Sequence, residues 1–360
     1  MTKRVLLIKM TSMGDLMHTL PALTDAAAAI PGIQFDWVAD EAFAEIPSWH
    51  RAVNQVINSA HRRWKKNLRQ ALHSGELKAF YQQLNAQRYD AVVDSQSNLK
   101  SAAVALLRRC GSQPGPVHGL DAVGVREKPA HWVYQQRHSS VTGAHAIAQQ
   151  RALMAAALGY QLPSSAPNFA IDRSQLTLPE LELPQRYLFF VHNASWQTKL
   201  WPEQHWQALI EQATQAGYSV LLPSGNEQEL QRAQRLAATS PLAHALPRLS
   251  LSAIAAIMDG ALAAVCCDTG LGHLAAVLDL PAVHFYGATD VALIGAQGPD
   301  QQHIIASSEH YPCAPCYLKQ CHFPAVETAA CMDSFRPQQV WQALLKIPAV
   351  ADIENSSTTG

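Results

Sequence analysis

Residues 4–39 read RVLLIKMTSMGDLMHTLPALTDAAAAIPGIQFDWVA, and the architecture follows from the pattern in this stretch. The apolar run 4–9 predicts a buried strand, and after a polar turn containing Gly14 the stretch 15–29 has the composition of a helix. A second strand is expected at 34–39. A strand, a helix and a strand in this order form the repeating unit of a parallel sheet with helices on its faces.

The same rhythm continues along the chain and restarts once. Strands are expected at 90–94, 187–191, 218–222, 263–267 and 282–286, and helices at 202–216 and 337–346. Prolines at 163, 167, 179 and 184 mark a looser stretch between two halves. We therefore expect an α/β protein of two doubly wound, Rossmann-like domains facing each other across a cleft. The expected parts are a domain at 1–165, a linker at 166–184, a domain at 185–335, a final helix at 336–350 and a flexible tail at 351–360.

Composition limits the classes of function. The 360 residues are 48% hydrophobic and 15% charged, which leaves enough apolar side chains for two cores. Lys and Arg number 27 against 28 Asp and Glu, so the net charge is −1 and we expect no nucleic acid partner. No apolar run reaches the roughly 20 residues of a membrane-spanning helix. Seven cysteines without an export signal indicate a soluble protein of the reducing cytoplasm.

The end of the first strand holds the first candidate site. The spacing of Ser12 and Asp15 fits a helix start, with Ser12 as N-cap and Asp15 as the acid of a capping box. The alternative is that Asp15 acts as a general base at the carboxyl end of the strand. A helix N-terminus lowers the pKa of a carboxyl group, which weakens a base. Spacing alone favours the capping role.

A basic run, HRRWKKNLR at 61–69, holds five Lys and Arg residues and no acid. Such runs are usually solvated helix faces. In a chain of almost no net charge, this density also suits a substrate with several carboxylates or phosphates, which Arg grips in a bidentate way. The candidate binding cations of this half are Arg62, Arg63, Lys66, Lys100 and Arg126.

Two loops of the second half have features of an anion site. Residues 195–202, SWQTKLWP, place Lys199 just before a helix, where the helix dipole and free N–H groups favour a phosphate. Residues 267–274, CDTGLGHL, pass from a strand end through an Asp and small residues into a helix, where N–H groups can face a diphosphate. Neither loop has a GxGxxG or GK[ST] fingerprint. An exposed lysine and an ordinary turn are the plainer interpretations.

Four cysteines lie close together in the sequence, with His310 and His322 nearby: Cys313, Cys316, Cys321 and Cys331. One pair has CxxC spacing, which resembles a zinc knuckle. The rest of the pattern lacks a second CxxC or an HxxxH pair, so free thiols and labile disulfides stay open beside a structural zinc. Nothing in the sequence places these cysteines at the predicted cleft, and no metal is expected at the active site.

Taken in order, these blocks resemble the lipopolysaccharide heptosyltransferases, and most of all the heptosyltransferase I branch that adds the first heptose. The resemblance runs from Val5 to the final helix. It is carried by KMTSMGDLMHTLPALTDAAAAIPGIQFDWV, EIPSWHRAV, HRRWKK, YDAVVDSQ, LKSA and KLWPEQHW…CDTGLGHLAAVLDLPAVHFYGATD. It implies a GT-B fold and an inverting transfer of L-glycero-D-manno-heptose from ADP-heptose to a Kdo hydroxyl of Kdo-lipid A. That reaction takes place at the cytoplasmic face of the inner membrane and needs no cofactor.

The resemblance also implies residue roles. Asp15 becomes the general base for the acceptor hydroxyl, which reverses the preference given by spacing. Lys199 steadies the donor diphosphate and joins Asp15 as a catalytic residue, and Glu229 holds the adenosine ribose. The remaining donor positions are Ser195, Asp268, Thr269, Gly270 and His273. The five cations named above become acceptor-binding residues for Kdo carboxylates and lipid A phosphates.

Departures from the family pattern keep other functions in view. Ala194 and Ser195 stand where heptosyltransferase I has threonines, and Ser97 and Asn98 replace a Gly-Leu pair. The cysteine segment resembles heptosyltransferase II, so the nearest alternative is a later heptosyltransferase (II or III) acting on an already heptosylated core. A nucleotide-sugar 2-epimerase would have no use for the basic run, and a sensor would bind ADP-heptose without turnover. The oligomeric state does not follow from the sequence.

Overall fold

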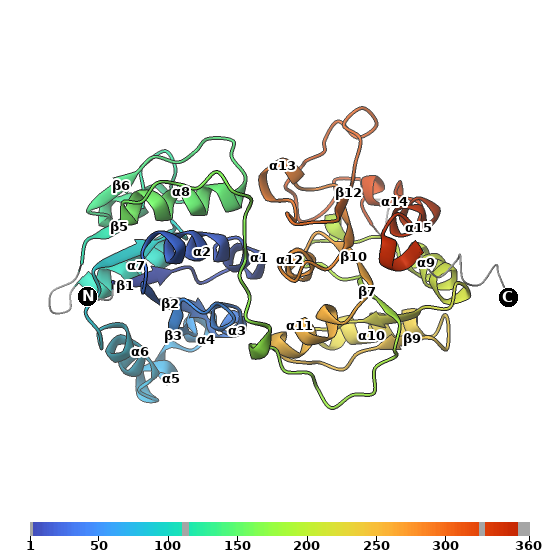
Figure 1. Ribbon diagram of the computed structural model, residues 1–360, viewed down its shortest axis with the longest axis horizontal. Coiled ribbons are helices and arrows are strands. Elements are labelled where there is room, and N and C mark those ends of the chain that lie inside the picture. The colour runs from blue at the N-terminus through green and yellow to red at the C-terminus, as the bar shows by residue number, and fades with distance from the viewer. Residues whose placement is uncertain (1–2, 110–114, 324–327, 352–360) are drawn as a thin grey trace. The chain divides into compact units, whose positions relative to one another are not determined.

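The computed structural model describes residues 3–109, 115–323 and 328–351. The chain divides into two compact units, Met1–Gln175 and Leu176–Gly360, at a point inside the predicted linker. Each unit is a six-stranded sheet with helices on its faces, as Figure 1 shows. The predicted class, two doubly wound Rossmann-like units, is confirmed. Apart from Ala351, the predicted flexible tail lies outside the described residues.

The sheet of the first unit is parallel throughout and follows the order β3-β2-β1-β4-β5-β6. Its strands are β1 (Arg4–Ile8), β2 (Gln34–Asp40), β3 (Val53–Ser59), β4 (Ala91–Asp94), β5 (Val117–Leu120) and β6 (Gln136–His138). Val5 of β1 is paired with Phe35 on one side and with Ala91 on the other. The strand order therefore reverses between β1 and β4, where α/β sheets leave a crevice for ligands.

The second unit repeats this topology. Its strands are β7 (Tyr187–Val191), β8 (Ser219–Leu222), β9 (Ala243–Ala245), β10 (Ala263–Cys267), β11 (Ala282–Tyr286) and β12 (Gln301–Ile305). The order β12-β11-β10-β7-β8-β9 is the order of the first unit when strands are counted from the start of each unit. All pairs are again parallel. The reversal falls between β7 and β10.

Helices cover both faces of the first sheet. They are α1 (Met13–Met17), α2 (Leu20–Ala29), α3 (Glu45–Ser48), α4 (His61–Lys66), α5 (Leu68–His73), α6 (Glu76–Leu84), α7 (Leu99–Arg109) and α8 (Ala146–Leu158), with 3-10 turns η1 (Glu41–Phe43), η2 (Lys128–Val133) and η3 (Arg173–Gln175). The helix predicted at 15–29 is instead two, α1 and α2. Pro21 stands in the first turn of α2, where its missing N–H is harmless, whereas inside one continuous helix it would remove a hydrogen bond.

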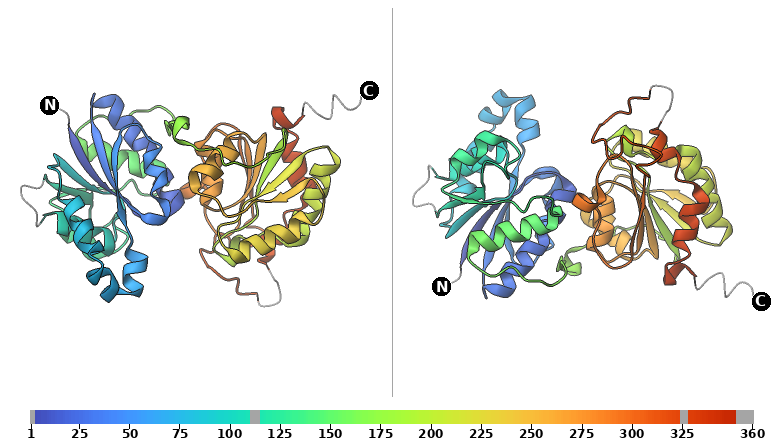
Figure 2. Two further views of the ribbon diagram at one scale, coloured as in Figure 1. Left: turned by 90° about the horizontal axis from the view of Figure 1, so that it is seen from below. Right: turned by 90° about the horizontal axis from the view of Figure 1, so that it is seen from above.

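In the second unit, the helices α9, α10 and α15 pack together on one face of the sheet, as the yellow to red helices of Figure 2 show. The elements are η4 (Gln197–Lys199), α9 (Glu203–Gln215), α10 (Glu227–Ala237), α11 (Leu251–Asp259), α12 (Gly270–Val277), α13 (Val291–Ile294), α14 (Ala330–Asp333) and α15 (Pro337–Leu344). Within the described residues, no helix is long and apolar enough to cross a bilayer.

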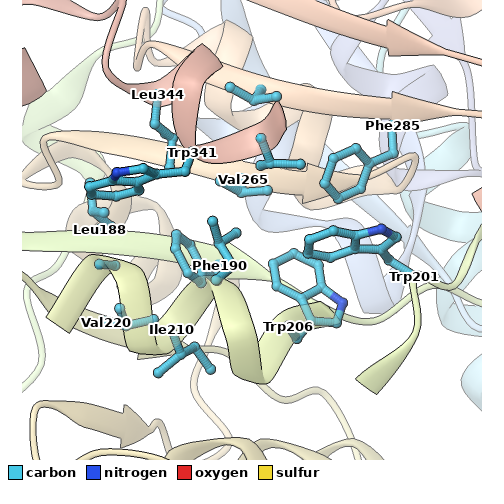
Figure 3. Close-up of a cluster of buried hydrophobic side chains, with 14 of the residues drawn as sticks. Leu188, Phe190, Trp201, Trp206, Ile210, Val220, Val265, Phe285, Trp341 and Leu344 are labelled. Atoms are coloured by element: carbon cyan, nitrogen blue, oxygen red, sulfur yellow. The ribbon is translucent and has the colours of Figure 1, made fainter. Parts of the chain in front are cut away.

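The core beneath these helices anchors a loop of the candidate site. Trp201 and Trp206 are fully buried and pack edge to face, and Phe285 lies against both (Figure 3). The indole N–H of Trp201 donates a 2.8 Å hydrogen bond to the carbonyl of Phe335. Because Trp201 follows Lys199 by two residues, this burial fixes one end of the loop that carries the lysine.

Candidate functional site

In each unit some candidate residues follow the carboxyl ends of the two central strands, while Arg62, Arg63 and Lys66 follow β3 and Glu229 follows β8. Asp15 comes after β1, and the turn at Asp94 ends β4. In the second unit Lys199 follows β7, and Asp268 directly follows β10. Each of these two pairs therefore lies at the reversal of strand order, the point at which doubly wound sheets bind ligands.

Asp15 forms the capping box that its spacing from Ser12 predicts. Its Oδ2 atom accepts hydrogen bonds of 2.7 Å from the backbone N–H of Ser12 and 2.7 Å from the Ser12 hydroxyl, so the capping box is present. Its Oδ1 atom lies 4.0 Å from Nζ of Lys9. The Asp15 side chain is 38% exposed, so the carboxylate is also open to a substrate.

The surroundings of Asp15 keep it ionised. Burial raises the pKa of Asp15. The charge of Lys9, the hydrogen bonds from Ser12 and the charge of Arg126 together lower the pKa by more than burial raises it, so the pKa lies below the ordinary value. Lys9 is itself buried, which lowers its pKa, while Asp15 and Asp94 raise it. Its ammonium donates a 3.0 Å hydrogen bond to the carbonyl of Ser95.

Sequence reasoning did not identify Lys9 as a site residue. The available signal was a lysine at the last position of an otherwise apolar strand, because a buried ammonium requires a partner.

Asp94 shapes the neighbouring turn. Its Oδ1 accepts from the N–H groups of Gln96 (3.0 Å) and Ser97 (3.1 Å), and its Oδ2 accepts from the Tyr134 hydroxyl (2.7 Å). Burial raises the pKa of Asp94, and these hydrogen bonds oppose the rise.

The predicted acceptor cations do not form one set. Arg126 acts electrostatically on both Asp15 and Lys9. Arg62 lies 3.7 Å from Asp40 and over the ring of Phe43.

Arg63 is the most fully engaged of them. It makes paired bonds of 3.1 and 3.0 Å to Glu41, and its Nη1 lies 2.8 Å from Glu76. Lys66 and Lys100 are exposed. Arg62 and Lys100 both lower the pKa of His61, which places them around the same ring.

The donor-side pair is tighter. Nζ of Lys199 lies 2.7 Å from Oδ2 of Asp268, and the two side chains are only 14% and 4% exposed. The Thr289 hydroxyl donates a short hydrogen bond to the same carboxylate oxygen. The Lys199 ammonium also lies 4.6 Å from the centre of the Trp196 ring. Sequence reasoning did not identify Trp196 or Thr289 as site residues.

The remaining donor positions lie at strand ends of the same sheet. Ser195 is exposed in the loop after β7. Thr269 is the N-cap residue of α12, its side chain makes no capping bond, and Gly270 begins the helix. His273 is buried in the first turns of α12. Glu229 belongs to the start of α10, where its carboxylate accepts 2.8 Å hydrogen bonds from the Gly225 N–H and the Asn226 amide.

The cysteine segment corrects two expectations. The thiols of Cys313, Cys316, Cys321 and Cys331 are free, and no group of three or more His, Cys, Asp or Glu among the described residues could hold a metal, so a zinc site has no support. Cys313 is exposed and the other three are partly buried, and Cys321 and Cys331 pack against the core of the unit.

The segment is also not remote from the candidate site. The Thr198 hydroxyl donates to the Leu318 carbonyl (2.5 Å), and the Cys321 N–H donates to the Gln197 side chain (3.2 Å). The Tyr317 N–H donates to the carbonyl of Ala288, which precedes Thr289 (2.8 Å). Residues 317–321 therefore brace the backbone on both sides of the Lys199–Asp268–Thr289 cluster.

Comparison with known proteins gives consistent matches. The model of glycosyltransferase family 9 (heptosyltransferase) matches residues 77–327. Lipopolysaccharide heptosyltransferase 1 of Pseudomonas aeruginosa is 48% identical over 324 residues, which cover 90% of this chain and 89% of that protein. The structure of E. coli heptosyltransferase WaaC with ADP superimposes with a TM-score of 0.82 at 39% identity, covering 95% of this chain and 99% of that one. Lipopolysaccharide heptosyltransferase 3 of E. coli is 22% identical over 77% of this chain and 81% of its own length.

Proposed function

Since the chain belongs to glycosyltransferase family 9, the heptosyltransferases, and has their GT-B type fold, we propose that it transfers L-glycero-D-manno-heptose from ADP-heptose to a Kdo hydroxyl of Kdo-lipid A. The protein is a glycosyltransferase. Its 48% identity to a heptosyltransferase 1, against 22% to a heptosyltransferase 3, favours addition of the first heptose over a later one. The ADP held by the similar WaaC structure supports an ADP-linked donor.

In the proposed reaction Asp15 is the general base. An inverting transfer needs the acceptor hydroxyl to attack the anomeric carbon on the face opposite the leaving ADP, and a carboxylate takes up the hydroxyl proton as the new bond forms. The observation that supports this role is that the two carboxylate oxygens of Asp15 have different surroundings. Its Oδ2 is held by Ser12, whereas its Oδ1 faces Lys9 across 4.0 Å on an accessible side chain.

On the donor side the leaving diphosphate gains negative charge as the glycosidic bond breaks. Lys199 supplies a positive charge that Asp268, Thr289 and Trp196 hold in place, and the N-terminus of α12 adds N–H groups with the favourable end of the helix dipole. We assign the adenosine ribose to Glu229, and the sugar and diphosphate to the loop from Asp268 to His273 together with Ser195. We assign no cofactor to the reaction.

The first unit takes the acceptor in this proposal, and the second unit takes the donor. Arg62, Lys66, Lys100 and Arg126 bind the carboxylates and phosphates of the acceptor. For Arg63 the structure favours a different part, because both ends of its guanidinium are bound to Glu41 and Glu76. We propose that it fixes α4 to η1 and α6 and so positions its neighbours. The enzyme works in the cytoplasm, at the inner membrane surface.

The test is ADP release by the purified protein with ADP-heptose and three acceptors, compared side by side. These are Kdo2-lipid A, phosphorylated Kdo-lipid A, and the same core already carrying one heptose. Turnover on either heptose-free acceptor supports the proposal and identifies the preferred core. Turnover confined to the heptosylated acceptor would assign a later step. Donor binding without turnover on any acceptor would favour a sensor.

A further inference from the structure

Helix α5 presents two leucines to solvent in the first unit. Leu68 and Leu72 are 56% and 61% exposed and are among the most exposed leucines of the described residues. They are four residues apart and so share one side of the helix, while Ala71 is buried beneath it. Figure 1 shows α5 beside α6 at the outer edge of the unit, beyond the sheet. The leucines therefore contribute nothing to the core, and their exposure is unfavourable unless something covers them.

The charge around these leucines has one sign. Residues 61–88 contain seven Lys and Arg residues and one acid, Glu76, in a chain whose net charge is −1. That acid is bound to Arg63 and to the indole N–H of Trp64.

The nearest acids on other elements are also engaged, because Asp40 lies beside Arg62 and Glu41 pairs with Arg63. Lys65, Lys66 and Arg69 are exposed, and none makes an ion pair with a carboxylate in the described part of the chain. These cations are free to meet an external anion.

We propose that this patch, called here the α5 surface and made of Lys65, Lys66, Leu68, Arg69 and Leu72, docks on an anionic lipid bilayer. Leu68 and Leu72 enter the interfacial layer, and the three cations lie among the phosphate headgroups. Exposed leucines flanked by cations form the composition of an interfacial helix, and each cation gains from the negative surface potential of such a membrane.

The connection between α4 and α5 links docking to substrate capture, and this part of the inference rests on the proposed function. Asn67 ends α4 and caps α5, with its side chain accepting a 3.2 Å hydrogen bond from the Gln70 N–H. Docking of α5 thus brings α4, with Arg62 and Lys66, to headgroup level, where a lipid-anchored acceptor displays its anionic groups. Two leucines give weak, reversible binding, which lets the enzyme leave one acceptor for the next.

The first experiment uses the full-length protein and vesicles that contain no acceptor. Vesicles of phosphatidylethanolamine and phosphatidylglycerol are compared with vesicles of phosphatidylcholine in a sedimentation assay. We expect binding to the anionic vesicles, and we expect Leu68→Gln/Leu72→Gln to lower the partition coefficient by roughly tenfold or more.

The matched control is Leu162→Gln/Leu178→Gln, which changes two leucines outside the basic run that are 43% and 60% exposed to solvent, and it should bind like the wild type. Thermal unfolding checks that both variants are folded. Equal binding by the α5 variant and the wild type, or no wild-type binding to anionic vesicles, would overturn the docking proposal. If instead the wild type self-associates in ultracentrifugation and the α5 variant is a monomer, the surface joins copies of this chain.

A second measurement separates this inference from the proposed function. Turnover is compared on acceptor embedded in anionic vesicles and on a deacylated, water-soluble acceptor. The α5 variant should lose turnover on the embedded acceptor and keep it on the soluble one. Leucine-dependent vesicle binding without turnover on either acceptor would remove the heptosyl transfer and leave the docking intact. Equal turnover of variant and wild type on the embedded acceptor would remove the link between docking and catalysis.

Discussion

Both units place a lysine beside an aspartate near the reversal of strand order, and the two pairs differ in distance and in exposure. Lys9 and Asp15 are 4.0 Å apart, and the aspartate is 38% exposed. Lys199 and Asp268 are 2.7 Å apart, and the aspartate is 4% exposed. A carboxylate with an unoccupied, accessible oxygen can take a proton from a substrate. A carboxylate oxygen that already receives an ammonium and a hydroxyl holds the lysine in position and is a poor acceptor for a substrate proton.

Replacing the accessible carboxylate should have the largest effect. Asp15→Asn keeps an oxygen that can accept from Ser12, so the helix start survives, but it removes the base. We expect transfer to fall by about 10³-fold, within the range for loss of a general base, with donor affinity unchanged. ADP release and calorimetric donor binding measure the two quantities.

The matched control is Asp290→Asn, the same change at another helix start, where the side chain accepts a 2.9 Å hydrogen bond from the Ala292 N–H. It should leave transfer close to normal. Transfer by Asp15→Asn at a rate near that of the wild type would show that another group removes the proton.

Double-mutant cycles should separate the two pairs by their coupling energies. For Lys199→Met and Asp268→Asn we expect a coupling of about 2–3 kcal/mol in the free energy of unfolding, because either single change leaves a buried charge alone. For Lys9→Met and Asp15→Asn we expect a coupling energy of less than about 1 kcal/mol, because the two charged groups are 4.0 Å apart and Asp94 also attracts Lys9. Urea unfolding of the four variants and two double variants gives both values. Equal couplings would mean that distance and exposure do not distinguish the pairs.

The pH dependence of transfer should show whether Lys9 acts on Asp15. The pKa of Asp15 is lowered, so the base form persists below the ordinary carboxyl pKa, and activity is lost only as the pH falls through the lowered value. Lys9→Met removes the largest influence that lowers this pKa. The acid limb of kcat/KM should therefore move to higher pH. A limb that stays in place would show that Lys9 does not act on the titrating group.

The smallest expected effect concerns the contact between residues 317–321 and the loop that carries Lys199. Thr198→Val removes the hydrogen bond to the Leu318 carbonyl while keeping the shape of the side chain. Because Thr198 precedes Lys199, we expect the KM for ADP-heptose to rise about two- to tenfold, with kcat less affected. Thr214→Val is the same change at another position, where it removes an exposed 3.3 Å hydrogen bond to the Glu211 carbonyl within α9, and it serves as the control. Equal KM values for the two variants would show that the contact between Thr198 and Leu318 does not affect donor binding.

Sequence reasoning succeeded where a residue's role depends on its chain neighbours. The predicted segments that form β1, β2, β4, β7, β8, β10 and β11 are local patterns, and so are the turn after β1, the loop after β10 and the capping box of Asp15, whereas β3, β5, β6, β9 and β12 were not predicted. It failed where partners come from other elements. Thr289 reaches Asp268 from the end of the adjacent strand, and nothing near it in the chain indicates this.

The basic run shows the same limit. Five cations in nine residues are visible in the sequence, but the acids that neutralise Arg63 lie on η1 and α6, and only the fold brings them together. A local count of charge therefore overstates how many of these cations a ligand can use. Lys9 is the reverse case, in which a single charge in an apolar run marks a buried centre of the site.

The parallel order of the two sheets also bears on how each half of the site comes into being. The reversal of strand order in the first unit forms only when β1 has paired with β4, through residues as distant as Val5 and Ala91, and in the second unit Leu188 must meet Ala263. Such pairing requires closure of a long loop, which is a slow step of folding. A unit in which these strands have not yet paired therefore contains its site residues, but they do not yet lie close together. Ligand binding by either unit therefore requires that the two central strands of that unit have paired.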